Sequence, residues 1–92
     1  MSKNSKDFLA AAERVKNLLA SPTNDELLCL YGLYKQAVEG DVTTERPGFF
    51  SFKEQKKWDA WNNYKGTQKS EAEIKYVQVV NMLIKRYGIK GN

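Results

Sequence analysis

Apolar side chains recur every three to four residues through most of the chain, which is the spacing of one face of an α-helix. The strict alternation of apolar and polar residues that is typical of strands is absent. We therefore expect four helices, at about residues 5–19, 24–39, 52–63 and 68–87. Each has one apolar stripe and a charged back, so all four should pack around a single core in an all-α bundle.

Serine and threonine residues mark where three of the helices should begin. Thr23 and Glu26 have the spacing of a capping box, and so do Ser51 and Glu54,. Thr67 can cap the fourth helix, although no acidic or amide side chain follows it at the box position. We expect these three side chains to accept hydrogen bonds from the first turns of their helices.

Proline and glycine residues indicate where the helices end. Ser21-Pro22 should end the first helix, because proline cannot continue one,. Gly40 and Gly88 should end the second and the fourth,. Residues 40–50 are then a loop, and residues 89–92 are expected to form a loose tail,.

The predicted core comes from the apolar stripes and from two tryptophans on the short third helix. Cys29 points away from its stripe and is expected to have no role, and Gly32 costs up to ~1 kcal/mol relative to alanine inside a helix,. The stripes consist of Phe8, Ala12, Val15 and Leu19, of Leu27, Leu30, Tyr31, Tyr34 and Val38, and of Ala72, Tyr76, Val79, Val80, Leu83 and Tyr87, with Trp58 and Trp61 between them.

Composition limits the classes of function. Ninety-two residues correspond to one domain, 1–92, and no apolar run approaches the ~20 residues that span a bilayer,. The first residues lack the apolar segment of a signal peptide, so we expect a cytoplasmic protein. A single cysteine and no histidine argue against disulfides, zinc and the usual catalytic base,. Binding is therefore favoured over catalysis, with no catalytic or metal-binding residues expected.

Tyr31, Tyr34 and Lys35 lie at positions i, i+3 and i+4 of the second predicted helix, and so on one side of it,. Two rings beside a cation could stack on a flat base and hold a phosphate. The alternative is that both tyrosine rings belong to the core with their hydroxyls exposed to solvent. The lysine would then lie at the edge of the core with its charged end in water. Spacing alone favours the alternative, because aromatic stripes usually form cores.

Lys53, Lys56 and Lys57 form a second candidate site at the start of the third helix. The start of a helix favours anions, and lysines there strengthen that preference. The plain alternative is a solvated basic face. The net charge of +4 is unevenly spread but forms no long basic run, so it favours an anionic ligand without demanding one,. Tyr76, in the middle of the fourth stripe, is by default a core residue.

Several motifs along nearly the whole chain resemble, in the right order, the acyl-CoA-binding protein family. No single motif would be specific, but the ordered set is. They are Pro22-Thr23-Asn24-Asp25, Tyr31-Gly32-Leu33-Tyr34-Lys35-Gln36-Ala37, Gly40-Asp41, Thr44-Glu45-Arg46-Pro47-Gly48, Lys57-Trp58-Asp59-Ala60-Trp61-Asn62, Lys65-Gly66, Tyr76 and Lys85-Arg86-Tyr87-Gly88-Ile89.

The resemblance implies a four-helix up-down-down-up bundle that binds medium- to long-chain fatty acyl-CoA esters. In similar proteins the residue at Tyr34 stacks on the adenine. The residues at Tyr31, Lys35 and Lys57 hold the ribose 3′-phosphate. The expected ligand-binding set is Lys16, Tyr31, Gly32, Leu33, Tyr34, Lys35, Lys53, Lys57 and Tyr76.

The remaining positions of the set are assigned by the same resemblance. The residues at Lys16 and Lys53 border the nucleotide, and that at Tyr76 lies nearer the acyl part. The acyl groove would involve Phe8, Ala12 and Leu28. Departures from the family pattern occur at Cys29, Leu33, Val38 and Phe49-Phe50. At the positions of Phe49 and Phe50, aliphatic residues are common in the family.

The function that the resemblance implies is that of a non-catalytic, monomeric carrier and buffer of acyl-CoA, without a cofactor. Its other partners would be acyl-CoA-using enzymes and membranes, met transiently. Two alternatives of other classes are a basic module for nucleic acid and a protein-interaction bundle without a small ligand. The first is disfavoured because the chain has no extended basic stripe,.

Overall fold

The computed structural model describes residues 4–91, so the ends of the predicted domain, residues 1–3 and 92, lie outside the described residues. Its helices confirm the expected all-α architecture. They are α1 (Lys6–Arg14), the short 3₁₀ helix η1 (Val15–Asn17), α2 (Asn24–Glu39), α3 (Phe52–Asn62) and α4 (Lys69–Tyr87).

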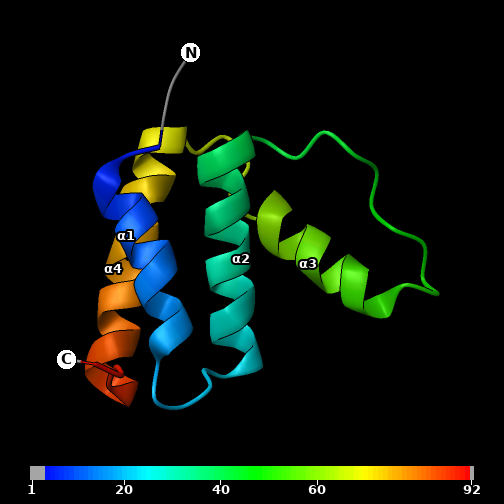
Figure 1. Ribbon diagram of the computed structural model, residues 1–92. Helices are drawn as coiled ribbons and strands as arrows, with labels where there is room; N and C mark the ends of the chain where they lie inside the picture. Colours follow the sequence, from blue (N-terminus) through cyan, green and yellow to red (C-terminus); the bar gives the residue numbers. More distant parts are fainter. Residues whose placement is uncertain (1–3, 92) are drawn as a thin grey trace.

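The helices have the up-down-down-up arrangement: α1 and α4 run one way, and α2 and α3 run the other (Figure 1). Helix α4 packs on both α1 and α2, whereas α3 packs on α2 at the outer side of the bundle. The result is flat, with principal extents of 41 × 34 × 15 Å. A long loop crosses from the end of α2 to the outer end of α3.

The core lies between α1, α2 and α4. Burial of this apolar surface is the main source of stability, at about 25 cal/mol per Å². The buried apolar side chains of this cluster are Phe8, Ala11, Leu30, Leu33, Ala37, Ala72, Tyr76, Val80 and Leu83. The predicted stripe of α4 is confirmed, with Val79 and Tyr87 at its margin.

The predicted core face of α2 was rotated from the observed one. Leu30, Leu33 and Ala37 are buried, whereas Leu27 and Tyr34 are exposed. The reason is that α2 has neighbours on two sides, α4 and α3, so its buried arc is wider and differently centred than a single stripe. The tyrosine motif therefore lies at the edge of the core, where it can meet a ligand.

The predicted first helix was too long, and the predicted loose tail was wrong up to Gly91. Helix α1 gives way to η1, and Leu18 then adopts an extended conformation. Leu18 and Ile89 form an antiparallel bridge: the amide of Leu19 donates to the Gly88 carbonyl at 3.0 Å, and that of Lys90 to Asn17 at 2.8 Å. The pairing of backbone groups of residues 17–19 with those of residues 88–90 outweighs continuation of the helix.

One of the three predicted caps is confirmed. Thr23 and Glu26 form both hydrogen bonds of a capping box. Ser51 makes no cap bond, because its φ of −106° and ψ of 59° depart from the extended cap conformation,. The N-cap of α4 is Gln68, also without a side-chain bond, so the prediction for Thr67 was wrong.

The backbones of α2 and α3 come very close at Gly32. A Cβ built there would lie 2.3 Å from the carbonyl oxygen of Ala60, so only glycine fits,. Beside it, Cys29 Sγ lies 3.3 Å from the hydroxyl of Tyr64. Burial, and then this contact with Cys29, raise the pKa of Tyr64 to about 12. Cys29 is thus part of the helix interface, contrary to the expectation that it has no role.

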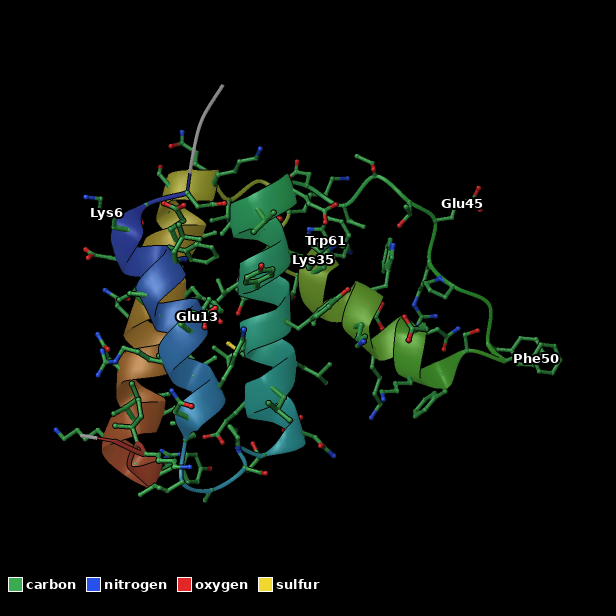
Figure 2. The ribbon with its side chains drawn as sticks, viewed as in Figure 1. Lys6, Glu13, Lys35, Glu45, Phe50 and Trp61 are labelled. Atoms are coloured by element: carbon green, nitrogen blue, oxygen red, sulfur yellow. The ribbon has the colours of Figure 1, made fainter. Side chains whose placement is uncertain are left out.

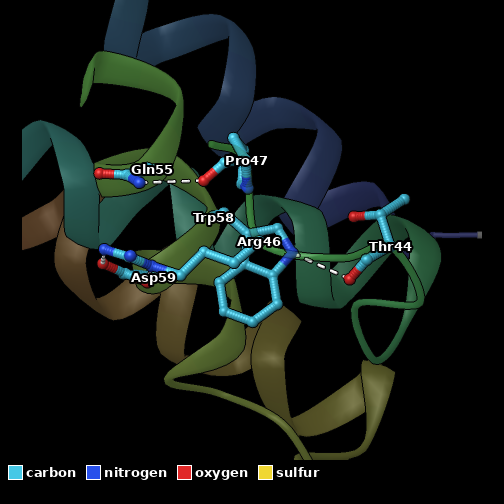
Figure 3. Close-up of polar contacts among 6 residues, drawn as sticks. All are labelled: Thr44, Arg46, Pro47, Gln55, Trp58 and Asp59. Atoms are coloured by element: carbon cyan, nitrogen blue, oxygen red, sulfur yellow. Dashed lines mark hydrogen bonds and ion pairs between the residues drawn. The ribbon is translucent and has the colours of Figure 1, made fainter. Parts of the chain in front are cut away.

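Residues 40–51 are tied to α3 by hydrogen bonds (Figure 3). Arg46 binds both carboxylate oxygens of Asp59, at 2.8 and 2.9 Å. The indole of Trp58 donates to the carbonyl of Thr44 at 3.1 Å, so this partly buried ring serves the loop rather than the core. Trp61 is buried, as predicted.

Replacing Gly32 by alanine should destabilise the protein by about 1–3 kcal/mol, because the new methyl group overpacks the α2–α3 contact. The better helix propensity of alanine offsets part of this cost. Urea unfolding measures the change. Gly48→Ala is the matched control, since nothing lies within 4 Å of a Cβ there. Equal stabilities of both variants would contradict the close approach.

Through Glu26, the stability of the folded protein should depend on pH. Hydrogen bonds from Tyr87 and Thr23, and then the charge of Arg86, hold its pKa below the ordinary value. This contribution is present above the ordinary pKa and is lost as the pH falls through the lowered pKa. Glu26→Gln should therefore be less stable than the wild type near neutral pH, and the difference should vanish in acid. Denaturant unfolding across pH tests this, with Glu71→Gln as control; a constant difference would contradict it.

Candidate functional site

A cleft of about 510 Å³ lies between the first half of α2 and the first half of α3. Its α2 wall is mostly apolar, with two polar residues at the start of the helix, and its α3 wall is basic. The lining residues are Asn24, Asp25, Leu27, Leu28, Tyr31, Phe52, Lys53, Lys56 and Lys57. A cleft with one apolar and one cationic wall suits a ligand that has both an apolar and an anionic part.

Lysine side chains lie over aromatic rings on the facing helices. The Nζ of Lys57 on α3 lies 5.3 Å from the ring centroid of Tyr31 on α2. In the reverse sense, Nζ of Lys35 on α2 lies 4.7 Å from the ring of Trp61 on α3. The negative ring faces attract the ammonium groups and restrain two flexible side chains. The two cations of the predicted phosphate site are thus both held at the α2–α3 interface.

Lys35 has a second partner, Glu39, one helical turn further along α2. Figure 2 shows Lys35 close to Trp61 where the two helices meet. The Lys35 side chain is 24% exposed, whereas that of Glu39 is 50% exposed. An anion arriving at Lys35 would compete with a carboxylate that solvent already weakens.

A cluster of three aromatic rings joins α1, α2 and α4. Tyr34 stacks on Phe8 with ring centroids 5.6 Å apart, and Tyr76 lies 5.0 Å from Phe8. Burial, and then the neighbouring Tyr34, raise the pKa of Tyr76 to about 12, so its phenol stays protonated. Tyr34 is 41% exposed, so the ring is held from inside while part of its surface remains open.

The other predicted site residues are placed less directly. Lys53 lines the cleft from the first turn of α3. Lys16 is exposed on η1 and forms an ion pair with Glu13 at 3.2 Å. Gly32 and Leu33 are buried, so their role in a site would be to position the neighbouring tyrosines. All of these assignments stay predictions.

The three residues expected to form an acyl groove have different surroundings. Leu28 lines the cleft between α2 and α3. Phe8 is fully buried in the core, and Ala12 is partly buried against that core. Of the three, Leu28 is the residue that could contact an apolar chain bound in the cleft.

Several residues of the site were missed by the sequence reasoning. Phe52 and Leu27 line the cleft, Trp61 supports Lys35, and Glu39 pairs with it. The spacing of Lys35 and Glu39, i and i+4, was a usable signal for the ion pair. Nothing local could reveal that Trp61 lies under Lys35, because the two belong to different helices.

Fold and cleft together define a small helical protein whose α2–α3 cleft has one mostly apolar and one basic wall. Within residues 4–91, no group of three or more histidine, cysteine, aspartate or glutamate residues could hold a metal ion. In the same range, none of the helices has the length and apolarity needed to cross a membrane.

The sequence model of the family described as "Acyl CoA binding protein" matches residues 5–80. An acyl-CoA-binding protein of Brassica napus is 55% identical over 78 residues, which are 85% of each chain. The chain therefore belongs to the acyl-CoA-binding protein family.

Solved structures agree with this assignment. The crystal structure of Oryza sativa acyl-CoA-binding protein 2 superposes with a TM-score of 0.85 at 44% identity, over 88% of this chain and 90% of that one. The solution structure of the yeast acyl coenzyme A binding protein gives 0.72 at 45% identity, over 91% and 98%. The fold predicted from the resemblance is thereby confirmed.

Proposed function

We propose that this protein binds fatty acyl-CoA esters between α2 and α3 and across the exposed edge of the aromatic cluster. The observation that carries the proposal is the pairing of Lys57 with Tyr31 and of Lys35 with Trp61 at one helix interface. These pairs place two cations beside a cleft with an apolar wall. Membership of the family supports the same ligand.

The nucleotide end of the ligand would use the charged and aromatic groups. Lys35 and Lys57, with the hydroxyl of Tyr31, would hold the ribose 3′-phosphate through charge-assisted hydrogen bonds. Tyr34 would stack on the adenine; such stacking is worth about 1–3 kcal/mol in nucleic-acid complexes. Lys16 and Lys53 would border the nucleotide, and Tyr76 would lie nearer the acyl part.

The acyl chain would extend over apolar surface, where each methylene removed from water contributes about 0.8 kcal/mol. Leu27 and Leu28 are the residues of the cleft that offer such surface on α2. Because the proposed roles are all binding roles, the protein would hold the thioester without reacting with it. We propose a non-catalytic carrier and buffer of acyl-CoA that is monomeric and cytoplasmic and needs no cofactor.

Isothermal titration calorimetry with free coenzyme A and with octanoyl-, dodecanoyl- and hexadecanoyl-CoA tests this function. Affinity should tighten with chain length, at one ligand per protein, until the apolar surface is covered. The gain arises because each added methylene leaves water. An affinity that is independent of chain length, or the absence of binding in a folded sample, would refute the proposal.

Lys35→Ala should weaken acyl-CoA binding by at least ~1.5 kcal/mol, the scale of one charge-assisted hydrogen bond. Lys6→Ala is the matched control, since this lysine lies on α1 at the opposite side of the molecule from α3 (Figure 2). Calorimetry of both variants with one ligand measures the difference. Equal affinities of the two variants would remove Lys35 from the site.

Tyr34→Ala should weaken the binding of free coenzyme A as well as that of its acyl esters, because stacking involves the nucleotide. Tyr34→Phe keeps the ring and should retain most of the affinity. If the alanine variant lost affinity for the acylated ligands alone, the assignment of Tyr34 to the adenine would be wrong.

A further inference from the structure

Three exposed phenylalanines lie where the loop meets α3, Phe49 and Phe50 at the end of the loop and Phe52 as the first residue of the helix; we call them the aromatic tip. Their exposures are 75%, 91% and 65%. Phe50 lies at the outermost point of the molecule, far from the bundle (Figure 2). Single exposed apolar residues are ordinary, but three large ones within four positions form a patch that indicates an interaction site.

The aromatic tip is held in place by the loop that carries it. The amide of Ser51 donates to the Gly48 carbonyl at 2.9 Å, which makes a tight turn around the first two rings. Gln55 Nε2 donates to the carbonyl of Pro47 at 2.9 Å. The rings of Phe49 and Phe50 touch, with centroids 4.3 Å apart. Because the loop is already ordered, binding through the aromatic tip would lose little conformational entropy. More of the free energy from the contact area would then appear as affinity.

Lysines surround the base of the aromatic tip. The Nζ of Lys56 lies 4.9 Å from the ring centroid of Phe52, and Lys53 and Lys57 belong to the same helix. Residues 49–57 contain three lysines and one acidic residue, Glu54, which gives a net charge of +2. Aromatic side chains next to lysines characterise protein surfaces that lie in the interface of anionic bilayers.

The shape of the aromatic tip argues for a bilayer rather than for a protein. Three phenylalanines can bury about 150–250 Å² each, which falls short of the ~800 Å² per partner of a stable protein interface. A projecting point can instead enter a fluid surface that needs no complementary shape.

We propose that the aromatic tip docks the protein on anionic lipid bilayers. The phenylalanine rings enter the boundary between headgroups and acyl chains, and Lys53 and Lys56 face the anionic headgroups. This docking is a property of the protein without ligand. Because Phe52, Lys53 and Lys56 also line the cleft between α2 and α3, it would bring the cleft to the membrane surface.

Vesicle flotation of the ligand-free protein tests the proposal, with phosphatidylcholine vesicles that contain or lack phosphatidylserine. The wild type should bind the anionic vesicles, less so at high salt. Phe49→Ser/Phe50→Ser should weaken that binding at least about tenfold, because two rings stay in water. The control Leu9→Ser/Ile74→Ser removes two exposed aliphatic side chains from the bundle and should bind like the wild type. Circular dichroism confirms the fold of each variant.

Three results would overturn the proposal: no vesicle binding by the wild type, equal binding by both double variants, or a wild-type dimer in sedimentation that the phenylalanine variant abolishes. The last would assign the aromatic tip to a second copy of the chain. Calorimetry with hexadecanoyl-CoA separates this proposal from the carrier function. A phenylalanine variant that binds ligand but not vesicles supports docking, whereas vesicle binding without any ligand binding would refute the carrier function alone.

Discussion

The close approach of α2 and α3 at Gly32 is the constraint on which the candidate site depends. With no side chain at this position, the carbonyl of Ala60 comes within a distance that any Cβ would forbid. The two helices can then place Lys57 over Tyr31, which is the residue before Gly32 on α2. They also place Lys35, three residues after Gly32, over Trp61. A glycine inside a helix has a conformational cost, but at this position it allows the four side chains of the candidate site to come together.

Restraint of charged side chains is the second theme of the site. A free lysine loses rotamer entropy when it binds an anion, which reduces the net gain. Here aromatic faces already limit the two lysines, and the ion pair with Glu39 orients one of them, Lys35. The buried Phe8 does the same for Tyr34, whose ring is supported from the core side. The arrangement resembles a binding surface prepared in advance of its ligand.

Features that depend on neighbours in sequence could be predicted, and those that depend on the meeting of distant segments could not. Helical periodicity located α2, α3 and α4 closely, and the box of Thr23 and Glu26 is local by nature. The bridge between Leu18 and Ile89 joins the segment after the first helices to the segment after α4, so no window of sequence contains it.

The candidate site divides along the same line. The motif around Tyr31, Tyr34 and Lys35 was visible because its members share one helix. Spacing alone nevertheless favoured a core role for the tyrosines, and the resemblance to a family was needed to name them as ligand residues. That Tyr34 lies at the edge of the core follows from the two neighbours of α2, which no pattern within α2 encodes.

The position of α3 has a consequence for how the molecule opens. Among the helices of residues 4–91, α3 packs on α2 alone, and its loop is tied back to α3 itself, through Arg46 and Asp59 among others. Helix and loop therefore form a cooperative unit that can detach while α1, α2 and α4 keep their shared core, so its amide protons should exchange first. A ligand that bridges α2 and α3 would slow that exchange. The exchange rate of the α3 amides would then report how much of the protein has ligand bound.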